Sequence, residues 1–326
     1  MSINAVITGT GSYLPEQILT NDDLAKKIDT TDEWIRTRTG IGARHMANDK
    51  ETTNFMAAQA AKRALEMADV APDDIDLIVV GTVSATHSFP ATACFVQREL
   101  GINNGAPAFD LQGACSGFIY ALDMATCQIK MGKIKKALVI GAEKFTSYVD
   151  WSDRSTCVLF GDGAGAVVLE AKEGERTGVL ATRLHADGNQ TELLIGTGGL
   201  SSTKTAGNVK MQGREVYKHA VRRMSGVVAP LLAEENITPE DIDWLVPHQA
   251  NLRIIEATAA HMNFPMEKVV QTVASHANTS AASVPLAIDV ANREGRFKPG
   301  QLLMLNAFGA GFTWAGALIK WDIPTR

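Results

Sequence analysis

The stretch that decides the fold is Asp110-Leu111-Gln112-Gly113-Ala114-Cys115-Ser116-Gly117-Phe118. An apolar segment at 106–109 leads into it as a predicted strand, and residues 118–131 follow as a predicted helix. Cys115 therefore lies at a helix N-terminus, among small residues that leave room for a substrate. Unpaired N–H groups and the helix dipole at such a position lower the pKa of a thiol. The pattern predicts a nucleophilic cysteine; the alternative is a small buried thiol that packs the strand–helix joint.

The overall composition indicates a globular chain large enough for a sizeable core. Of 326 residues, 45% are apolar and 21% are charged, and the net charge of −5 argues against general nucleic-acid binding. No apolar run approaches the length of about 20 residues that a membrane helix needs, and the N-terminus does not have the pattern of a signal peptide. The four cysteines are widely spaced, which favours a reducing compartment and gives no zinc motif. We therefore expect a cytoplasmic protein that does not bind membranes.

The second half of the chain repeats the first. Four segments recur in the same order: 72–79 at 239–246, 114–117 at 277–280, 132–135 at 295–298, and 164–168 at 315–319. Strands and helices alternate in each half, so we expect two α/β halves, residues 1–172 and 173–326, each with a mainly parallel sheet. The polar segment 172–175 is the expected link. The repeat aligns Cys115 with Asn278, and we expect both to face one pocket at the carboxyl ends of the strands.

Two further segments carry candidate site residues. His248 follows the predicted strand 244–247, at the same sheet edge as Cys115. His276, two residues before Asn278, is a rival that the sequence pattern alone does not exclude. The glycine-rich loop at 306–312 allows close approach of backbone to a ligand, and one of its N–H groups could donate to an oxyanion; the alternative is an ordinary glycine-rich turn.

Over nearly its whole length the chain resembles the thiolase-fold condensing enzymes, and among them the β-ketoacyl-[acyl carrier protein] synthase III family. The motifs that carry the resemblance are Ala114-Cys115-Ser116-Gly117-Phe118, His248-Gln249-Ala250-Asn251, His276-Ala277-Asn278-Thr279-Ser280 and Phe308-Gly309-Ala310-Gly311-Phe312-Thr313-Trp314. A Cys–His–Asn set distinguishes this branch from elongating synthases, which have a second histidine, and from thiolases, which have a second cysteine near the C-terminus. Hydroxymethylglutaryl-CoA synthase resembles it in fold but uses a glutamate.

The resemblance implies a duplicated, thiolase-like α/β fold in a layered αβαβα arrangement. It also implies that Cys115 takes an acyl group from acyl-CoA and that His248 and Asn278 stabilise the enolate formed as malonyl-acyl carrier protein loses carbon dioxide. A neutral imidazole and a side-chain amide are suitable donors for that charge. The family's oxyanion hole corresponds to the backbone N–H groups of Cys115 and Ala310. Glycine is common at the second position, and the methyl group of Ala310 is expected to narrow the pocket or strain the loop.

The resemblance implies further contacts. The residues that correspond to coenzyme A contacts are Trp34, Arg38, Thr39, Arg154 and Asn251. Phe89 and Phe308 correspond to the acyl pocket, with Phe89 reaching into the pocket of a partner subunit, which implies a homodimer. On residue type alone Trp34 is a half-buried surface aromatic. No ligand cluster indicates a metal or a redox cofactor, so acyl-CoA and malonyl-acyl carrier protein are expected as substrates without a resident cofactor.

A basic stripe points to an acidic partner. Arg214, Lys218 and Arg222 recur every four residues on a predicted helix, and like charges at that spacing destabilise a helix by about 0.2–0.5 kcal/mol per pair. Together with Arg253, they form the predicted docking site for acyl carrier protein; the alternative is a solvated helix face.

Two other functions remain open from sequence. One is an enzyme with the same triad in a secondary-metabolite pathway, with another acyl donor or acceptor. The other is a non-catalytic acyl-binding or carrier-binding subunit, which the presence of Cys115, His248 and Asn278 together disfavours.

Overall fold

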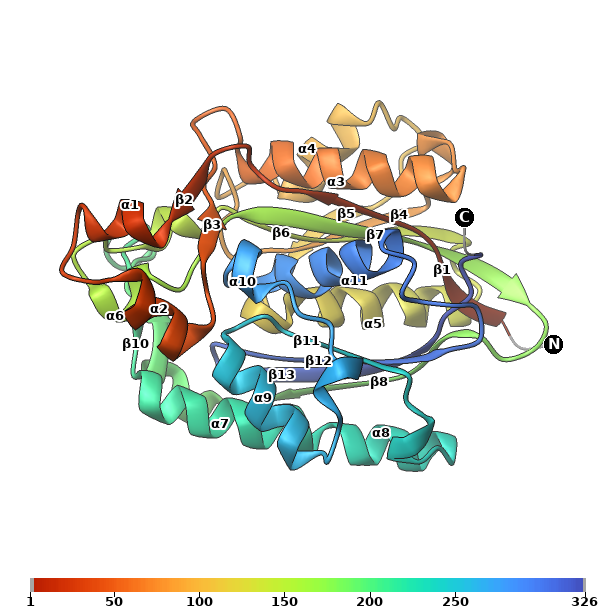
Figure 1. The fold of residues 1–326 in the computed structure, drawn as a ribbon. Coiled ribbons are helices and arrows are strands. Elements are labelled where there is room, and N and C mark those ends of the chain that lie inside the picture. Colours follow the sequence, from red (N-terminus) through yellow and green to blue (C-terminus); the bar gives the residue numbers. More distant parts are fainter. Residues whose placement is uncertain (1–2, 325–326) are drawn as a thin grey trace.

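The computed structural model describes residues 3–324, which form five layers of helices and sheets (Figure 1). Helices cover the outer face of each of two sheets, and a third pair of helices lies between them. The layered αβαβα arrangement predicted from the sequence is confirmed. Residues 1–2 and 325–326, the outer ends of the two predicted halves, lie outside the described residues.

The first sheet has five strands in the order β1-β7-β6-β4-β5. Their bounds are Ile3–Tyr13 (β1), Leu77–Gly81 (β4), Ala108–Leu111 (β5), Lys136–Glu143 (β6) and Gly163–Glu173 (β7). Helices α3 (Thr53–Ala68) and α4 (Thr92–Glu99) cover its outer face. The alanine-rich face of α3 packs closely on β1, because a Cβ at Gly9 or Gly11 would lie 2.2 Å from a carbonyl oxygen of α3.

The second sheet has four strands in the order β11-β12-β13-β8. Their bounds are Gly178–Ala186 (β8), Trp244–Pro247 (β11), Leu302–Gly309 (β12) and Thr313–Lys320 (β13). Helices α7 (Gly213–Gly226), α8 (Val228–Glu235) and α9 (Leu252–His261) lie on its outer side (Figure 1). The central layer consists of α5 (Gly117–Lys130) and α11 (Ser283–Arg293), and its apolar side chains join both sheets into one core.

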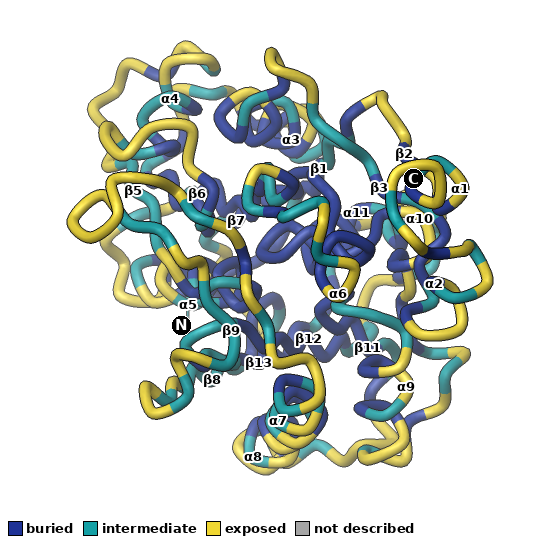
Figure 2. The backbone as a smooth tube through the Cα atoms, turned by 90° about the vertical axis from the view of Figure 1, so that its left-hand side faces the viewer, coloured by how far each residue is buried: buried dark blue, intermediate teal, exposed yellow. Residues whose placement is uncertain are grey.

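Shorter elements surround one end of these layers. They are β2 (Ile18–Thr20), α1 (Asn21–Ala25), α2 (Asp32–Thr39), β3 (Ala43–His45), α6 (Arg154–Cys157), β9 (Leu194–Gly196), β10 (Val209–Met211) and α10 (Val273–His276). The 3₁₀ turns are Pro72–Asp74, Ala114–Ser116, Phe145–Tyr148, Gly188–Leu193, Pro239–Asp241, Met266–Lys268 and Ser280–Ala282. Viewed from this end, the sheets and central helices form a buried interior within a rim of partly exposed loops (Figure 2).

The expectation of mainly parallel sheets was wrong. Strand β4 pairs in parallel with β5 and β6, but β7 runs antiparallel to both β6 and β1. In the second sheet only β11 and β12 are parallel. Residues 310–312 alone join β12 to β13, and so short a connection permits only antiparallel pairing.

The internal repeat is visible in the structure, with one change of alignment. Ala114 and Ser280 each have a left-handed φ, of 45° and 50°, at the start of a 3₁₀ turn that leads into a central helix. Cys115 therefore corresponds to Ala281, and Asn278 lies three residues earlier than the sequence alignment placed it. The 132/295 match holds, because both glycines follow the central helix with φ near 70°. The alignment therefore shifts by three residues at the start of the central helices, because α11 is shorter than α5.

The bounds proposed for the two halves follow this arrangement closely. All strands of the first sheet end by Glu173, and all strands of the second begin at Gly178 or later. These bounds support our proposal that the chain divides at residues 172 and 173.

Candidate active site

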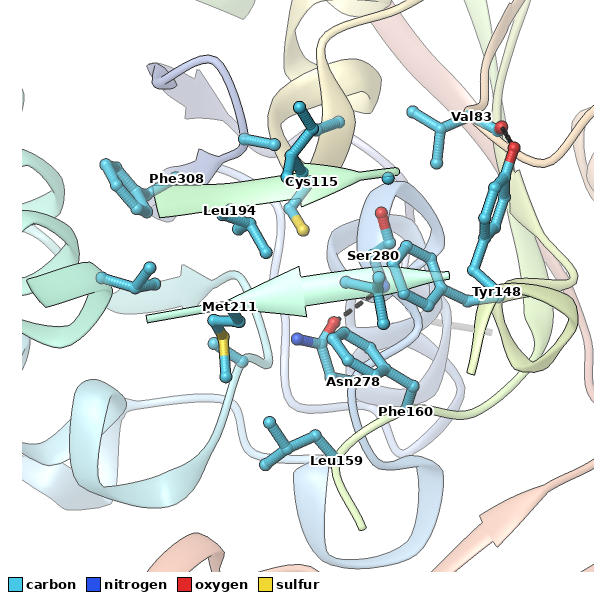
Figure 3. Close-up of a pocket in the computed structure, with 18 of the residues that line it drawn as sticks. Val83, Cys115, Tyr148, Leu159, Phe160, Leu194, Met211, Asn278, Ser280 and Phe308 are labelled. Atoms are coloured by element: carbon cyan, nitrogen blue, oxygen red, sulfur yellow. Dashed lines mark hydrogen bonds between the residues drawn. The ribbon is translucent and has the colours of Figure 1, made fainter. Parts of the chain in front are cut away.

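A cavity of about 1570 Å³ opens at the end of the layers where the parallel strands terminate. Cys115, His248 and Asn278 all line it, as do Phe308 and Ala310. They come from both halves of the chain, and Figure 3 shows Cys115, Asn278 and Phe308 around the same space. The sequence prediction that these residues meet in one pocket agrees with this geometry.

Cys115 is held by contacts between the two halves of the chain. It lies in the 3₁₀ turn between β5 and α5, and its backbone nitrogen touches the end of β12, where a Cβ at Gly309 would lie 2.6 Å from it. The Thr313 hydroxyl donates to the carbonyl of Gly113 at 2.8 Å, and the Ser116 hydroxyl donates to the carbonyl of Thr313 at 3.3 Å. These contacts fix the backbone on both sides of the thiol.

The expected lowering of the thiol pKa was wrong. Cys115 is 8% exposed, and burial raises the pKa of its thiol to about 12, because a thiolate in this setting loses its hydration. A hydrogen bond with the Ser280 hydroxyl opposes the shift, whereas the charge of Glu143 adds to it. The free protein therefore holds a neutral thiol, which must lose its proton when it attacks.

His248 is a neutral hydrogen-bond donor. It follows β11 and is 2% exposed, and burial lowers its pKa to about 3. Its Nδ1 lies 2.6 Å from Ser283 Oγ, which also accepts the backbone N–H of Gln249 at 3.3 Å. Because no other acceptor for this hydroxyl occurs among residues 3–324, the Ser283 hydrogen points to Nδ1. The ring hydrogen is then on Nε2.

Asn278 has a similarly fixed orientation. Its Oδ1 accepts the backbone N–H of Ser280 at 2.9 Å, and this bond distinguishes the amide oxygen from the amide nitrogen. The nitrogen points away from that bond (Figure 3). The backbone of Asn278 is bound on both sides to the segment 159–161, through Leu159 O and Gly161 N. The cavity thus contains two neutral N–H donors from different elements.

The rival histidine lies elsewhere. His276 does not line the cavity, and its ring packs against His45 with centroids 6.0 Å apart. Burial, with an additional contribution from the charge of His45, lowers the pKa of His276 to about 4. His276 is therefore a packed, neutral side chain, and the geometry favours His248 as the site histidine.

The glycine-rich loop accommodates alanine at position 310 without backbone strain. Ala310 lines the cavity, and its backbone φ is not positive. The expected strain is therefore not present, although the methyl group does border the cavity. Phe308 is 3% exposed, and its ring centroid lies 4.6 Å from that of Phe312. It therefore forms a closely packed apolar wall of the cavity.

The predicted coenzyme A contacts gather around α2 and the start of α9. Trp34, Arg38, Thr39 and Asn251 line the cavity, and Trp34 is half-buried as expected. The guanidinium carbons of Arg38 and Arg154 lie 4.5 and 4.7 Å from the Trp34 ring centroid. Arg154 itself is outside the cavity lining and donates to the carbonyl of Asp29 at 2.7 Å.

Thr39 and Asn251 also have structural roles. The Thr39 hydroxyl donates to the carbonyl of Ile35 at 2.7 Å and accepts the N–H of Ile41 at 3.0 Å. The side chain of Asn251 caps α9 by accepting the N–H of Ile254 at 3.0 Å. A ligand contact at either residue would therefore have to share these polar groups with the local backbone.

Three of the four predicted docking cations line the cavity. They are Arg214, Lys218 and Arg253. Arg222 instead lines a separate hollow of about 360 Å³ together with Arg223, so the basic stripe on α7 is divided between two surfaces. Phe89 is 83% exposed and does not line the cavity of its own chain.

Several residues around the site were not identified from the sequence. The hairpin formed by β9 and β10 contributes Leu194 and Met211 to the cavity (Figure 3), without a chemical motif that could have indicated it. Two other residues near the site, Ser283 and Glu143, could have been identified from the sequence. Ser283 is a polar residue at the first turn of an apolar helix, and Glu143 is a lone carboxylate that ends the buried strand β6.

Residues 3–324 contain neither a metal-ligand cluster nor a membrane-spanning helix. They contain no group of three or more metal-ligating side chains. No helix in this part of the chain has the length and apolar character to span a membrane.

Comparisons with known proteins agree on one family. Residues 109–188 match the family model of 3-oxoacyl-[acyl-carrier-protein] synthase III, and residues 232–321 match the model of its C-terminal part. A β-ketoacyl-[acyl-carrier-protein] synthase III of Erythrobacter litoralis is 54% identical over 98% of this chain and 100% of its own length. One from Xanthomonas campestris is 55% identical over 97% of this chain and 98% of its own.

Solved structures show the same relationship. The 3-oxoacyl-[acyl-carrier-protein] synthase III of Aquifex aeolicus has a TM-score of 0.93 at 48% identity, covering 97% of this chain and 100% of its own. The priming β-ketosynthase of the R1128 polyketide pathway has a TM-score of 0.93 at 35% identity, covering 99% of this chain and 98% of its own. The chain therefore belongs to the β-ketoacyl-[acyl-carrier-protein] synthase III family of thiolase-fold condensing enzymes.

Proposed function

We propose that the chain initiates fatty-acid synthesis by a decarboxylative Claisen condensation of an acyl-CoA primer with malonyl-acyl carrier protein, through an acyl-Cys115 intermediate. The observation that carries this proposal is the convergence of one thiol and two neutral N–H donors in a single cavity. That set suits a reaction in which a nucleophile is acylated and an enolate is then stabilised.

In the first half-reaction, Cys115 Sγ attacks the thioester carbonyl of acyl-CoA. Negative charge develops on the carbonyl oxygen, and we assign its stabilisation to the backbone N–H groups of Cys115 and Ala310. The close packing of Gly309 on the Cys115 nitrogen supports this assignment, because it brings the two backbone segments together. Coenzyme A leaves, and Phe308 provides an apolar wall for the acyl chain.

In the second half-reaction, the malonyl thioester loses carbon dioxide, and its carbonyl oxygen acquires the charge of an enolate. We assign donation to that oxygen to His248 Nε2–H and the Asn278 amide, and their presence in one cavity supports this assignment. Neither donor carries a positive charge at neutral pH, so the donors do not form an ion pair with the malonyl carboxylate that would oppose its loss. The carbanion then attacks acyl-Cys115 and releases the β-ketoacyl product.

The cavity mouth supports substrate assignments. We propose that the adenine of coenzyme A stacks at Trp34 between the indole and a guanidinium of Arg38 or Arg154, with Thr39 and Asn251 alongside. The guanidinium carbons of Arg38 and Arg154 lie 4.5 and 4.7 Å from the ring centroid, so whichever guanidinium covers the base must move outward to admit it.

The acyl carrier protein is proposed to dock on Arg214, Lys218 and Arg253 at the mouth, with Arg222 farther along α7. We also propose a cytoplasmic homodimer that needs no cofactor. The exposed Phe89 and the half-buried edge strand β5 support a second subunit, and four free cysteines suit a reducing compartment.

The test is intact-protein mass spectrometry after mixing with a panel of acyl-CoAs, followed by malonyl-acyl carrier protein. We expect wild-type protein to gain one acyl mass and to lose it on addition of the malonyl substrate. Cys115→Ser should gain no stable thioester mass. His248→Ala should gain the acyl mass and retain it, because only the second half-reaction needs the histidine. If wild type gains no acyl mass with any acyl-CoA of the panel, the proposal is contradicted.

A polyketide-priming function is the second candidate, and the R1128 ketosynthase is the observation that favours it. The two functions differ in their acyl donor and acceptor. The primer identified by the mass measurement, and turnover with the carrier protein of fatty-acid synthesis, distinguish them.

A further inference from the structure

A buried carboxylate, that of Glu143, lies one hydroxyl group away from the Cys115 side of the cavity. Ser280 lines the cavity together with Cys115, and its hydroxyl donates to Glu143 Oε1 at 3.2 Å. In Figure 3 the Ser280 oxygen lies on the side of the residue that faces Cys115. Because the hydroxyl hydrogen is given to Glu143, an oxygen lone pair is free to accept the thiol hydrogen. This arrangement would let a proton move from the thiol to the hydroxyl as the hydroxyl hydrogen moves to the carboxylate.

Glu143 is held in a ring of donors at the end of β6. It is fully buried, and its Oε2 accepts from the Thr82 hydroxyl at 3.3 Å and from the Ser84 backbone N–H at 3.1 Å. The Ser84 hydroxyl and the Val83 N–H also donate to the carboxylate. Burial raises the pKa of Glu143 to about 7 despite these donors. An appreciable carboxylate fraction is therefore present at neutral pH.

The other polar groups beside the thiol are poor proton acceptors. The pKa of His248 is lowered to about 3, and its Nδ1 already receives the Ser283 hydrogen. Asn278 does not titrate, and its amide oxygen is bound to the Ser280 N–H. The thiol, with its pKa near 12, must nevertheless give up a proton as the acyl group arrives. Within residues 3–324, Glu143 is the carboxylate connected to it.

We propose that Glu143 and Ser280 form a proton relay for Cys115 in the acyl-transfer half-reaction. The inference rests on the proposed function, because it concerns attack on an acyl-CoA thioester. As the bond from Sγ to the acyl carbon forms, the thiol proton passes to Ser280 Oγ and the Ser280 proton passes to Glu143 Oε1. When the bond between the acyl carbon and the coenzyme A sulfur breaks, the proton returns through Ser280 to that sulfur. The thiol proton thus ends on coenzyme A, and Glu143 is again a carboxylate.

The relay predicts a pH dependence for acyl transfer. Below the pKa of Glu143 the carboxyl is protonated and cannot accept a proton, so the rate should fall as the pH drops through neutrality. The titratable groups that face Glu143 are the Cys115 thiol and the Tyr148 phenol, and both have raised pKa values. Neither of them ionises near pH 7, so the inflection belongs to Glu143.

The test is the single-turnover rate of acyl-Cys115 formation from acyl-CoA between pH 5.5 and 9, with intact mass as readout. Glu143→Gln keeps the size of the side chain but cannot accept the proton. We expect it to lower the neutral-pH rate by about 10²-fold and to abolish the inflection, since general base catalysis contributes at least that much. Glu143→Asp should retain an inflection. Ser280→Ala should lose it while leaving the carboxylate in place.

A matched control separates the relay from a structural effect. Asp162 is also fully buried, its carboxylate receives the N–H groups of Ala47 and Thr146, and it is outside the cavity lining. Asp162→Asn should leave the inflection unchanged. If Glu143→Gln proves unstable, Ser280→Ala decides the question.

The possible outcomes separate the two proposals. Wild-type rates and inflections in both Glu143→Gln and Ser280→Ala would overturn the relay, while the acyl adduct they form would leave the proposed function standing. Absence of an adduct in wild type would overturn the proposed function and the relay with it. Loss of the inflection in both variants, but not in Asp162→Asn, would establish the relay.

Discussion

At the scale of single residues, the site depends on a side chain that touches no substrate. Ser283 fixes which nitrogen of His248 carries hydrogen, because its own hydrogen goes to Nδ1 at 2.6 Å. Without that hydroxyl, His248 is free to adopt the other tautomer, whose Nε2 cannot donate to an enolate.

We predict that Ser283→Ala slows condensation of preformed acyl-enzyme by about 10²-fold, the usual cost of losing one oxyanion donor. Acyl transfer from acyl-CoA should be unchanged. Ser283→Thr retains the hydroxyl and should restore condensation. The measurements are the two single-turnover rates and the ¹⁵N NMR shifts of the His248 ring. An unchanged tautomer in Ser283→Ala would contradict the assignment.

Gly309, the last residue of β12, and its neighbour Ala310 should differ sharply in how well they tolerate substitution. A Cβ at Gly309 would lie 2.6 Å from the Cys115 nitrogen and 3.1 Å from the Ala114 Cβ. We predict that Gly309→Ala displaces the thiol and slows acyl transfer by at least about 10²-fold, because catalysis is sensitive to misplacement of about 1 Å. Ala310→Gly serves as the control and should keep near-wild-type rates, because position 310 needs no positive φ. Equal rates in the two variants would contradict this view.

At the scale of elements, α7 presents its cations to two different surfaces. Arg214 and Lys218 line the cavity, whereas Arg222 lines the separate hollow. The helical spacing correctly predicted that Arg214, Lys218 and Arg222 are all exposed. Spacing along one helix could not show that neighbouring elements divide its exposed face.

We predict that Lys218→Glu raises KM for malonyl-acyl carrier protein by about 10-fold at low salt, because it reverses a charge at the cavity mouth. Arg222→Glu, the matched control on the same helix, should have a smaller effect. Acyl transfer from acyl-CoA should be unchanged in both. The measurement is KM at two salt concentrations, and a larger effect for Arg222→Glu would move the docking site to the hollow.

At the scale of the whole molecule, buried histidines connect folding to pH. The pKa of His276 is about 4 in the folded chain, below its usual value of 6.5. Between these values the unfolded chain binds a proton that the folded chain does not. Stability contributed by neutral His276 is therefore complete above pH 6.5 and declines as the pH falls towards 4.

We predict that His276→Gln is less stable than wild type at pH 7.5, and that this difference in the free energy of unfolding becomes smaller by about 1 kcal/mol at pH 5.5. The difference shrinks because wild type loses stability as the pH falls, whereas glutamine does not titrate. Comparing the two proteins at each pH cancels the titration of all other groups, including Glu143, whose raised pKa acts in the opposite direction. The measurement is the free energy of unfolding in urea. A constant difference at the two pH values would show that His276 titrates normally.

The sequence pattern by itself predicted two α/β halves with Cys115 and Asn278 facing one pocket. The family resemblance in the sequence added the layered arrangement and the choice of His248 over His276. Apolar periodicity and the internal repeat reflect local spacing, and spacing is sufficient to place residues at strand ends. It did not determine strand direction in the sheets, since hydrophobic pattern is the same for parallel and antiparallel pairs. It also aligned Asn278 three residues too far along, because the difference in helix length appears only in the backbone.

Only the tertiary structure decided the protonation of the site. A helix N-terminus favours a thiolate, yet burial by residues distant in sequence raises the Cys115 pKa to about 12. The same burial keeps His248 neutral, and Ser283, 35 residues away, orients its ring. Likewise Glu143 meets the thiol through Ser280, 137 residues distant. Desolvation and hydrogen-bond partners depend on which segments pack together, and that information is absent from local sequence pattern.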